Sequence, residues 1–219
     1  MAGLGRNTEL PEFLFHIVHE VDDAISFSLS KSIFDGTEEE LKKTENTQPA
    51  LMTVSMAFFE VMKREFGINP SEKAKYFAGH SLGEYTALCA AGALSLRDTA
   101  RILRVRGKAM SDACPTGGAM AAILGLDINQ VEEIVDEACS DTAKVQIAND
   151  NSVGQIVVSG HEEAVKKAAE IAQSRGARRA VILPVSGPFH SVLMKPAMRV
   201  LEEVLSDIEF KSSSKPIIA

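Results

Sequence analysis

A serine between two glycines is the residue whose setting most clearly indicates chemistry. Gly79, Ser81 and Gly83 form a G-x-S-x-G pattern between an expected strand and an expected helix. In a nucleophile elbow, this pattern makes a sharp turn that holds the serine hydroxyl out at the end of the sheet. The N–H of Leu82, at the start of the helix, would point toward the same spot as an oxyanion donor. The alternative is an ordinary Gly/Ser turn, and the flanking strand and helix favour the elbow.

A serine is a weak nucleophile without a general base, and one histidine stands where such a base is expected. His190 follows a Ser-Gly-Pro-Phe loop between an expected strand and an expected helix, a setting in which catalytic groups are often presented. The alternative for His190 is a loop histidine that faces water. The other histidines are assigned to exposed helix positions (His16, His19), the elbow itself (His80) and a helix start (His161). No further ligands lie near His16 and His19, so no metal site is expected.

A third candidate, Arg106, stands out from the other charged residues of the expected helix 95–113. At about 100° per residue, the charged side chains of Arg101, Arg104, Lys108 and Asp112 share one face, whereas Arg106 falls within the apolar stripe. An inward arginine costs free energy unless it meets an anion. Two interpretations stay open: Arg106 pairs with an internal carboxylate, or it binds the carboxylate of a substrate through its forked guanidinium.

Composition places these residues in an ordinary globular protein. The 219 residues are 45% hydrophobic and 24% charged, which is enough chain to bury a core. A net charge of −7, with 5% aromatic residues and no Trp, argues against nucleic-acid binding. No apolar run of about 18 residues is present, so no membrane span is expected, and the start shows no secretory signal. Three cysteines without a C-x-x-C pair indicate reduced thiols of a cytoplasmic protein, with neither disulfides nor zinc.

Hydrophobic spacing predicts the elements that must position the candidate residues. Helices are expected at 11–34, 50–66, 84–91, 95–113 and 192–206, and short strands at 74–78 and 215–219. The helix at 50–66 is expected to have Pro49 in its first turn, to end at Gly67 and to be buried, because its apolar residues lie nearly all round. The run at 215–219 is an apolar strand for which the sequence shows no partner.

The segment after Gly118 predicts a self-contained unit with the order βαββαβ. Its strands are expected at 119–125, 144–148, 155–159 and 180–184, and its helices at 129–139 and 162–175. This order is typical of the ferredoxin-like arrangement. The window 160–199 also holds seven basic and three acidic residues, a net charge of +4, so a local basic face could dock an acidic partner. The alternative is that these basic residues form ordinary solvated helix faces.

Several motifs, in this order, resemble the malonyl-CoA:acyl carrier protein transacylase family. They are Thr47–Ala50, Gly79–Tyr85, Arg106–Met110, Gly118–Ala122, Asn149-x-Asn151 and Gly187–His190. The resemblance covers nearly the whole chain and implies an α/β fold: an α/β-hydrolase-like core with a parallel sheet and an inserted ferredoxin-like small domain. The large domain, discontinuous and incomplete, is expected at 1–117 and 186–219, and the small domain at 118–185.

The resemblance also implies roles for individual residues. Ser81 corresponds to the acyl-accepting nucleophile, His190 to its general base, and Arg106 to the residue that binds the malonyl carboxylate. Leu82 corresponds to the backbone oxyanion donor, whereas Asn149 and Asn151 match positions near the cleft, and Phe189 resembles malonyl-selective members.

The implied activity is ping-pong transfer of a malonyl group from coenzyme A to the phosphopantetheine thiol of acyl carrier protein, in fatty acid biosynthesis. The implied enzyme is a monomer that needs no cofactor or metal. Two rivals stay open: a serine hydrolase or thioesterase on the same fold, and an inactive truncated acyltransferase that acts only as a binding protein.

The chain departs from the family at both ends. Members open with a strand and a Gly-Gln-Gly-Ser-Gln segment whose glutamine contributes to the oxyanion hole, and Met1–Arg6 resembles the stretch just after it. Members also continue past Ala219, where a later glutamine orients the histidine. We therefore expect a sequence truncated at both ends, and loss of one oxyanion donor would cost about 10²–10³ in rate.

Overall fold

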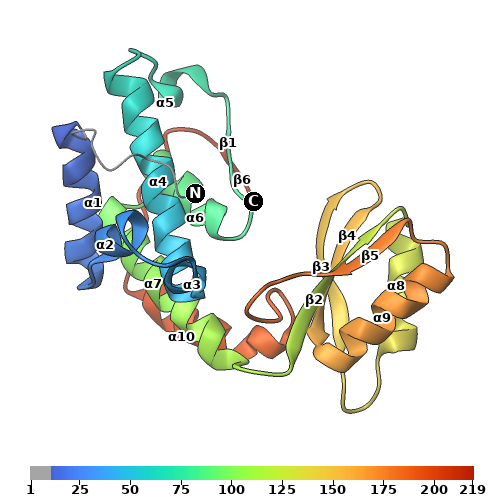
Figure 1. Ribbon diagram of the computed structural model, residues 1–219. Coiled ribbons are helices and arrows are strands. Elements are labelled where there is room, and N and C mark those ends of the chain that lie inside the picture. Colours follow the sequence, from blue (N-terminus) through green and yellow to red (C-terminus); the bar gives the residue numbers. More distant parts are fainter. Residues whose placement is uncertain (1–10) are drawn as a thin grey trace. The chain divides into compact units, whose positions relative to one another are not determined.

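The computed structural model describes residues 11–219, so the Met1–Arg6 stretch lies outside the described residues. The chain divides into two compact units, one formed by Met1–Lys108 with Leu201–Ala219 and the other by Ala109–Val200. The second unit contains the whole range expected for the small domain and adds flanking residues on both sides. Figure 1 labels the helices and strands of each unit.

The first unit is mainly helical around a very short parallel sheet. Its elements are α1 (Glu12–Ile25), α2 (Leu29–Phe34), α3 (Glu38–Lys42), α4 (Thr44–Arg64), α5 (Pro70–Lys73), β1 (Phe77–Ala78), α6 (Leu82–Ala90), most of α7 (Leu96–Ala113) and β6 (Ile217–Ile218). Its core is formed by buried side chains from α1, α2, α4 and α7, among them Val21, Leu29, Met52 and Leu103. Because Ser95 caps α7 through Asp98, the helix begins where the sequence predicts.

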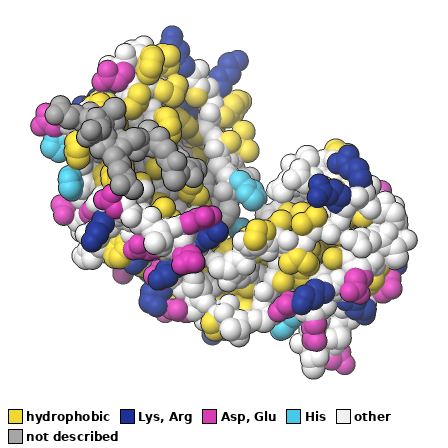
Figure 2. Space-filling model, viewed as in Figure 1, with side chains coloured by type: hydrophobic (Ala, Val, Ile, Leu, Met, Phe, Trp, Pro, Cys, Tyr) yellow, Lys and Arg dark blue, Asp and Glu magenta, His cyan; other side chains and the backbone are white. Residues whose placement is uncertain are grey.

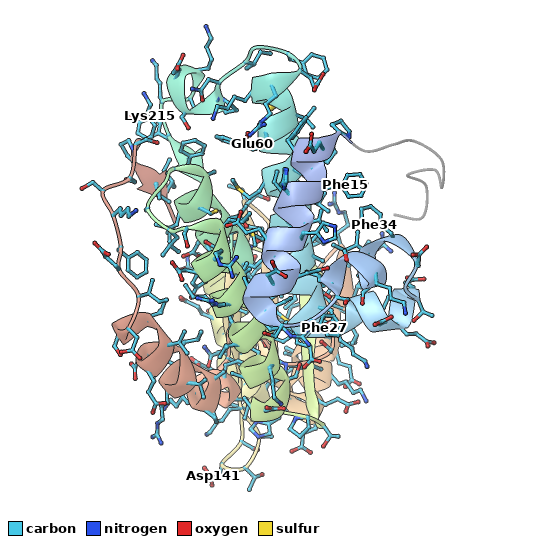
Figure 3. The ribbon with its side chains drawn as sticks, turned by 90° about the vertical axis from the view of Figure 1, so that its left-hand side faces the viewer. Phe15, Phe27, Phe34, Glu60, Asp141 and Lys215 are labelled. Carbon is cyan, nitrogen blue, oxygen red and sulfur yellow. The ribbon has the colours of Figure 1, made fainter. Side chains whose placement is uncertain are left out.

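The single helix expected at 11–34 is two helices. Ser26 ends α1 with a left-handed backbone, at a φ of 50°. The carboxylate of Asp22 accepts hydrogen bonds from the N–H and the hydroxyl of Ser30, at 2.9 and 2.5 Å, which stabilises the break. Phe27, in the connection, lies between the end of α1 and α7 (Figure 3), and its ring lies 4.4 Å below the Arg104 guanidinium.

Helix α4 differs from its prediction in both start and burial. It begins at Thr44, so Pro49 lies inside the helix rather than in its first turn. Proline has no N–H to give the carbonyl of Glu45, and the Arg104 side chain donates to that oxygen instead, at 3.0 Å. The expectation of a buried helix is wrong for the second half, where Phe58 and Met62 are 65% and 40% exposed.

Strand β1 pairs in parallel with β6, from the far end of the sequence. The register joins Phe77 to Ile217 and Ala78 to Ile218, and the two strands lie side by side in Figure 1. The apolar run at 215–219 thus forms part of the expected strand, and its partner, which the sequence did not show, is the strand that leads into Ser81. Only two residues of the strand expected at 74–78 form regular structure.

The two glycines around Ser81 differ in what the packing demands of them. A Cβ on Gly79 would lie 2.0 Å from the carbonyl oxygen of Gly83, which no rotation of a side chain could relieve. A Cβ on Gly83 would meet no atom within 4 Å among the described residues. The close approach of strand and helix therefore depends on Gly79 alone.

The second unit has the predicted ferredoxin-like arrangement. It contains β2 (Gly118–Leu124), α8 (Ile128–Ala138), β3 (Val145–Ser152), β4 (Gln155–His161), α9 (Glu162–Ser174) and β5 (Arg179–Ile182). A 3₁₀ turn η1 (Val192–Met194) and the first half of α10 (Lys195–Ser206) follow, and the second half of α10 belongs to the first unit. The strand order is β3-β4-β2-β5, and every neighbouring pair is antiparallel. Both helices cover one face of this sheet (Figure 1), and side chains such as Ile123, Ile134, Val158 and Val165 are fully buried there.

Neither a membrane span nor a metal cluster is found among the helices and side chains of the described part of the chain. Across residues 11–219, no helix combines the length and the apolar character that a bilayer crossing requires. In the same range, no three or more His, Cys, Asp and Glu side chains are grouped to hold a metal ion. The three cysteines are free thiols, and burial raises the pKa of Cys89 to about 11, so this thiol stays protonated at neutral pH.

The glycine pair gives a test of the turn. We expect Gly79→Ala to destabilise the first unit by about 3 kcal/mol or more, because the new methyl group meets backbone atoms that cannot move aside. Gly83→Ala is the matched control and should be neutral or stabilising by up to about 1 kcal/mol, because alanine favours the helix. Urea unfolding followed by circular dichroism measures both, and equal losses for the two variants would contradict the packing argument.

Candidate active site

Ser81 occupies a strained turn between β1 and α6. It is the residue before the first turn of α6, with a φ of 57° and a ψ of −114°. A positive φ is uncommon outside glycine and costs about 1–3 kcal/mol, so the surrounding turn must impose it. Hydrogen bonds from Gly83 N–H to His80 C=O and from Glu84 N–H to Ser81 C=O close the turn. This strained strand–turn–helix is the local geometry of a nucleophile elbow.

Leu82 is the first residue of α6, so its N–H belongs to the donors that a helix leaves for an external acceptor. It lies at the positive end of the helix dipole, where developing negative charge is stabilised. The position fits the predicted oxyanion donor.

Arg106 reaches from α7 to the Ser81 hydroxyl. Its guanidinium donates one hydrogen bond to Gln48 Oε1, at 2.5 Å, and another to Ser81 Oγ, at 3.0 Å. The residue is 8% exposed, which confirms the predicted inward position. The Tyr85 ring centroid lies 5.6 Å from the guanidinium carbon.

The charge of Arg106 is not neutralised by a carboxylate in contact with it. Within residues 11–219, Arg106 forms no ion pair, and both of its hydrogen-bond acceptors are neutral. Burial lowers the pKa of the guanidinium, while Tyr85 and Glu84 act in the opposite direction; an arginine still remains protonated at neutral pH. The interpretation of Arg106 as half of an internal ion pair is therefore not supported by the described residues.

Gln48 is a candidate site residue that the sequence did not single out. It lies in the Thr47–Ala50 motif, which indicated only the family resemblance. It lies in α4 and is 4% exposed. An amide next to proline, inside an otherwise apolar helix, was the available signal. Gly107 explains how Arg106 reaches it: a Cβ on Gly107 would lie 2.5 Å from Glu45 Cα, so α7 passes against the backbone of α4 at this point.

An open groove of about 530 Å³ runs beside the Ser81 turn, between α4, β1 and α6. Its walls are mainly apolar and include Met56, Phe59, Phe77 and Leu82, with His80 at the turn. The groove lies wholly within the first unit.

His190 belongs to the second unit, in the connection between β5 and η1. It is exposed and has a φ of 58°, so two of the residues with predicted catalytic roles have left-handed backbones. Phe189, beside it, packs against a small apolar cluster formed by Met110, Met194 and Ala197. The cluster fixes the loop on one side of the histidine.

Asn149 and Asn151 lie on β3, where the ladder to β4 is irregular. The register shifts between Ile147 and Asn149 and again between Asp150 and Ser152. Bulges of this kind redirect side chains and are over-represented next to active sites. Asn149 is partly buried and Asn151 is exposed.

The structure thus brings Ser81, Leu82 and Arg106 together in the first unit and adds Gln48 to them. His190, Phe189, Asn149 and Asn151 belong to the second unit.

The chain is similar to known acyl transferases in both sequence and fold. Residues 17–219 match the family model described as an acyl transferase domain. The malonyl CoA-acyl carrier protein transacylase of Bacillus subtilis (strain 168) is 49% identical over 201 residues, which cover 91% of this chain and 62% of that protein. The crystal structure of an acyl-carrier-protein-S-malonyltransferase from Bartonella henselae is 51% identical, with a TM-score of 0.88 over 94% of this chain and 65% of that one.

A malonyl-transacylase solved in complex with a type II polyketide synthase acyl-carrier protein is also similar, at 39% identity and a TM-score of 0.87, covering 94% of this chain and 65% of that one. The chain thus spans less than two thirds of the length of these relatives. With a family model that matches more than nine tenths of its length, it belongs to the acyl transferase domain family.

Proposed function

We propose that the protein transfers a malonyl group from coenzyme A to the phosphopantetheine thiol of acyl carrier protein, as a step of fatty acid biosynthesis. The observation that carries this proposal is the buried Arg106 cation, bonded to Ser81 Oγ and to no carboxylate among residues 11–219. The names of the Bacillus and Bartonella relatives support the same activity.

A malonyl thioester fits this arrangement because its carboxylate is one methylene away from the carbonyl that the serine attacks. With Ser81 Oγ and Arg106 Nη2 at 3.0 Å, a substrate attacked at Ser81 has its carboxylate within reach of the guanidinium. An anion there supplies the charge partner that Arg106 lacks among the described residues, and a forked, charge-assisted pair is the strongest form of such contact. A general esterase has no use for a buried cation at this place.

In the proposed mechanism, His190 accepts the proton of Ser81 as Oγ attacks the thioester carbon. The Leu82 N–H donates to the developing oxyanion, and the thiolate of coenzyme A leaves and takes the proton from His190. The malonyl group remains as an ester of Ser81, with its carboxylate on Arg106. The carrier thiol then loses its proton to His190 and attacks the ester, and the proton returns to Ser81 Oγ as the malonyl thioester departs.

The remaining assignments are part of the same proposal. Phe189 selects for malonyl units, and Asn149 and Asn151 line the cleft. The residues 1–117 and 186–219 form the large domain, with 118–185 inserted as the small one. The enzyme works in the cytoplasm as a monomer and needs neither cofactor nor metal.

The basic window on the second unit supports docking of an acidic carrier. Two of its seven basic residues are paired with acids: Arg175 with Glu133 and Glu137, and Lys166 with Glu162. Within residues 11–219, Arg178 and Arg179 form no ion pair, so their charge is available to a partner. Figure 2 shows Lys and Arg side chains at the upper end of the second unit, and others lower down beside Asp and Glu side chains. We propose that Arg178 and Arg179 contact the carrier protein.

Covalent labelling tests the nucleophile. Radiolabelled malonyl-CoA should leave one malonyl group on the protein, recovered on the peptide that contains Ser81, and Ser81→Ala should abolish the label. Ser95→Ala, at the cap of α7, is the control and should be labelled like the wild type. Release of free malonate without transfer to the carrier would indicate the hydrolase instead, and label that survives Ser81→Ala would refute the assignment.

Substitution of Arg106 tests the carboxylate site. Arg106→Ala should reduce the preference for malonyl-CoA over acetyl-CoA by about 100-fold, because a charged hydrogen-bonded pair contributes about 1.5–3 kcal/mol. Arg106→Lys should lose less, since it keeps the charge but not the fork. Arg97→Ala, an exposed arginine of the same helix, is the control. Ratios of kcat/KM for the two thioesters measure the effect, and an unchanged ratio in Arg106→Ala would mean that the residue is structural.

Charge reversal tests the docking surface. The double variant Arg178→Glu/Arg179→Glu should raise the KM for acyl carrier protein about 10-fold or more at low salt while leaving hydrolysis of malonyl-CoA unchanged. The matched control, Lys166→Glu/Lys167→Glu, makes the same change of charge on α9, where Lys166 is paired with Glu162 and Lys167 donates to the carbonyl of Glu137. Equal effects of the two doubles would show that only the overall charge matters.

A further inference from the structure

The Gln146 side chain, from the sheet of the second unit, bonds to the loop that carries His190. Gln146 lies in β3, directly opposite Ser159 of β4, so its backbone is fixed by the ladder. Its amide oxygen accepts a hydrogen bond from the N–H of Val192, at 2.9 Å. Its amide nitrogen donates to the carbonyl of His190, at 3.5 Å.

The oxygen and the nitrogen of the Gln146 side-chain amide form hydrogen bonds on opposite sides of the turn that begins at His190. The backbone of His190 has a φ of 58°, a conformation that costs a non-glycine residue about 1–3 kcal/mol unless its surroundings impose it. By holding the carbonyl of His190 and the N–H of Val192, Gln146 restrains the chain on both sides of the strained residue. An amide is suited to this because it offers a donor and an acceptor side by side.

Two further hydrogen bonds of the loop are local. The Ser191 hydroxyl donates to the carbonyl of Pro188, at 2.7 Å, and accepts from the N–H of Leu193, at 3.3 Å. These bonds shape the turn but join residues within three positions of one another. Pro188 packs on Gly118 so closely that a Cβ there would lie 2.4 Å from the ring, which fixes the front of the loop.

We propose that Gln146 is a positioning residue for His190: its amide holds the turn in the left-handed conformation from which the imidazole is presented. The role of His190 as general base rests on the proposed function, whereas the restraint of the loop by Gln146 does not. Loss of the restraint lets the imidazole sample other positions, and a misplacement of about 1 Å can cost about 100-fold in rate.

Gln146→Met keeps the length of the side chain and removes both hydrogen bonds. Gln173→Met is the matched control, since the Gln173 amide also donates to a backbone carbonyl of the second unit, that of Ala180, at 3.4 Å, away from the loop. Gln146→Glu is the conservative variant: it keeps the acceptor for Val192 but has no donor for His190. Thermal unfolding shows whether all three variants fold.

The first readout is amide hydrogen exchange, which needs no activity. In Gln146→Met the Val192 amide should exchange about 10-fold faster or more, while the Leu193 amide, held by Ser191, keeps its protection. Gln146→Glu and Gln173→Met should leave Val192 protected. Unchanged exchange of Val192 in Gln146→Met overturns the proposal, whatever the enzyme does.

The second readout is steady-state malonyl transfer. We expect Gln146→Met to lower kcat about 10- to 100-fold with the KM for malonyl-CoA nearly unchanged, Gln146→Glu to lose less, and Gln173→Met to match the wild type. A purely structural role would predict equal losses in Gln146→Met and Gln173→Met, which overturns the positioning role. A wild type that fails to label Ser81 contradicts the proposed function, and the exchange result then still decides whether Gln146 holds the loop.

Discussion

A buried arginine without a carboxylate partner among residues 11–219 is the constraint around which the first unit is organised. Arg106 is 8% exposed, and its guanidinium bonds to the Gln48 amide and the Ser81 hydroxyl, neither of which carries charge. Placing a cation there is unfavourable in the absence of an anion, which is the reason for the proposal that an anionic group of the substrate binds to Arg106. The side chains of Gln48, Arg106 and Ser81 thereby connect α4 and α7 to the turn before α6.

The contact of Arg106 with Gln48 and Ser81 is possible because the backbones of neighbouring elements approach each other closely. Gly107, next to Arg106, lets α7 pass against the start of α4, and Gly79 lets the end of β1 pass against the start of α6. Neither Gly79 nor Gly107 leaves room for a side chain, whereas the position of Gly83 has room for a Cβ atom. The serine between Gly79 and Gly83 is thereby held with a φ of 57°, and packing at its neighbours maintains the backbone strain at Ser81.

Most of the helices and strands of the second unit could be predicted from the sequence, because each of them shows the hydrophobic periodicity typical of its type. The strands and helices of that unit lie within a few residues of their expected bounds, and the sheet has the expected order. Predictions for the first unit failed where residues distant in the sequence determine the ends of a helix or the partner of a strand. The break at Ser26 depends on Asp22 and Ser30, the early start of α4 depends on Arg104, and the partner of the apolar run at 215–219 is more than a hundred residues away.

The sequence by itself determined the chemistry available: a serine in an elbow, a loop histidine, an arginine in an apolar stripe, and a βαββαβ unit. These features follow from the spacing of residue types over short stretches of the sequence, which does not depend on the tertiary fold. Only the tertiary structure decided what Arg106 meets, since the choice between a carboxylate and a neutral amide depends on which helix packs across from α7. It also revealed Gln48 and Gln146, because an amide acquires a role only when packing brings a distant partner within hydrogen-bond distance.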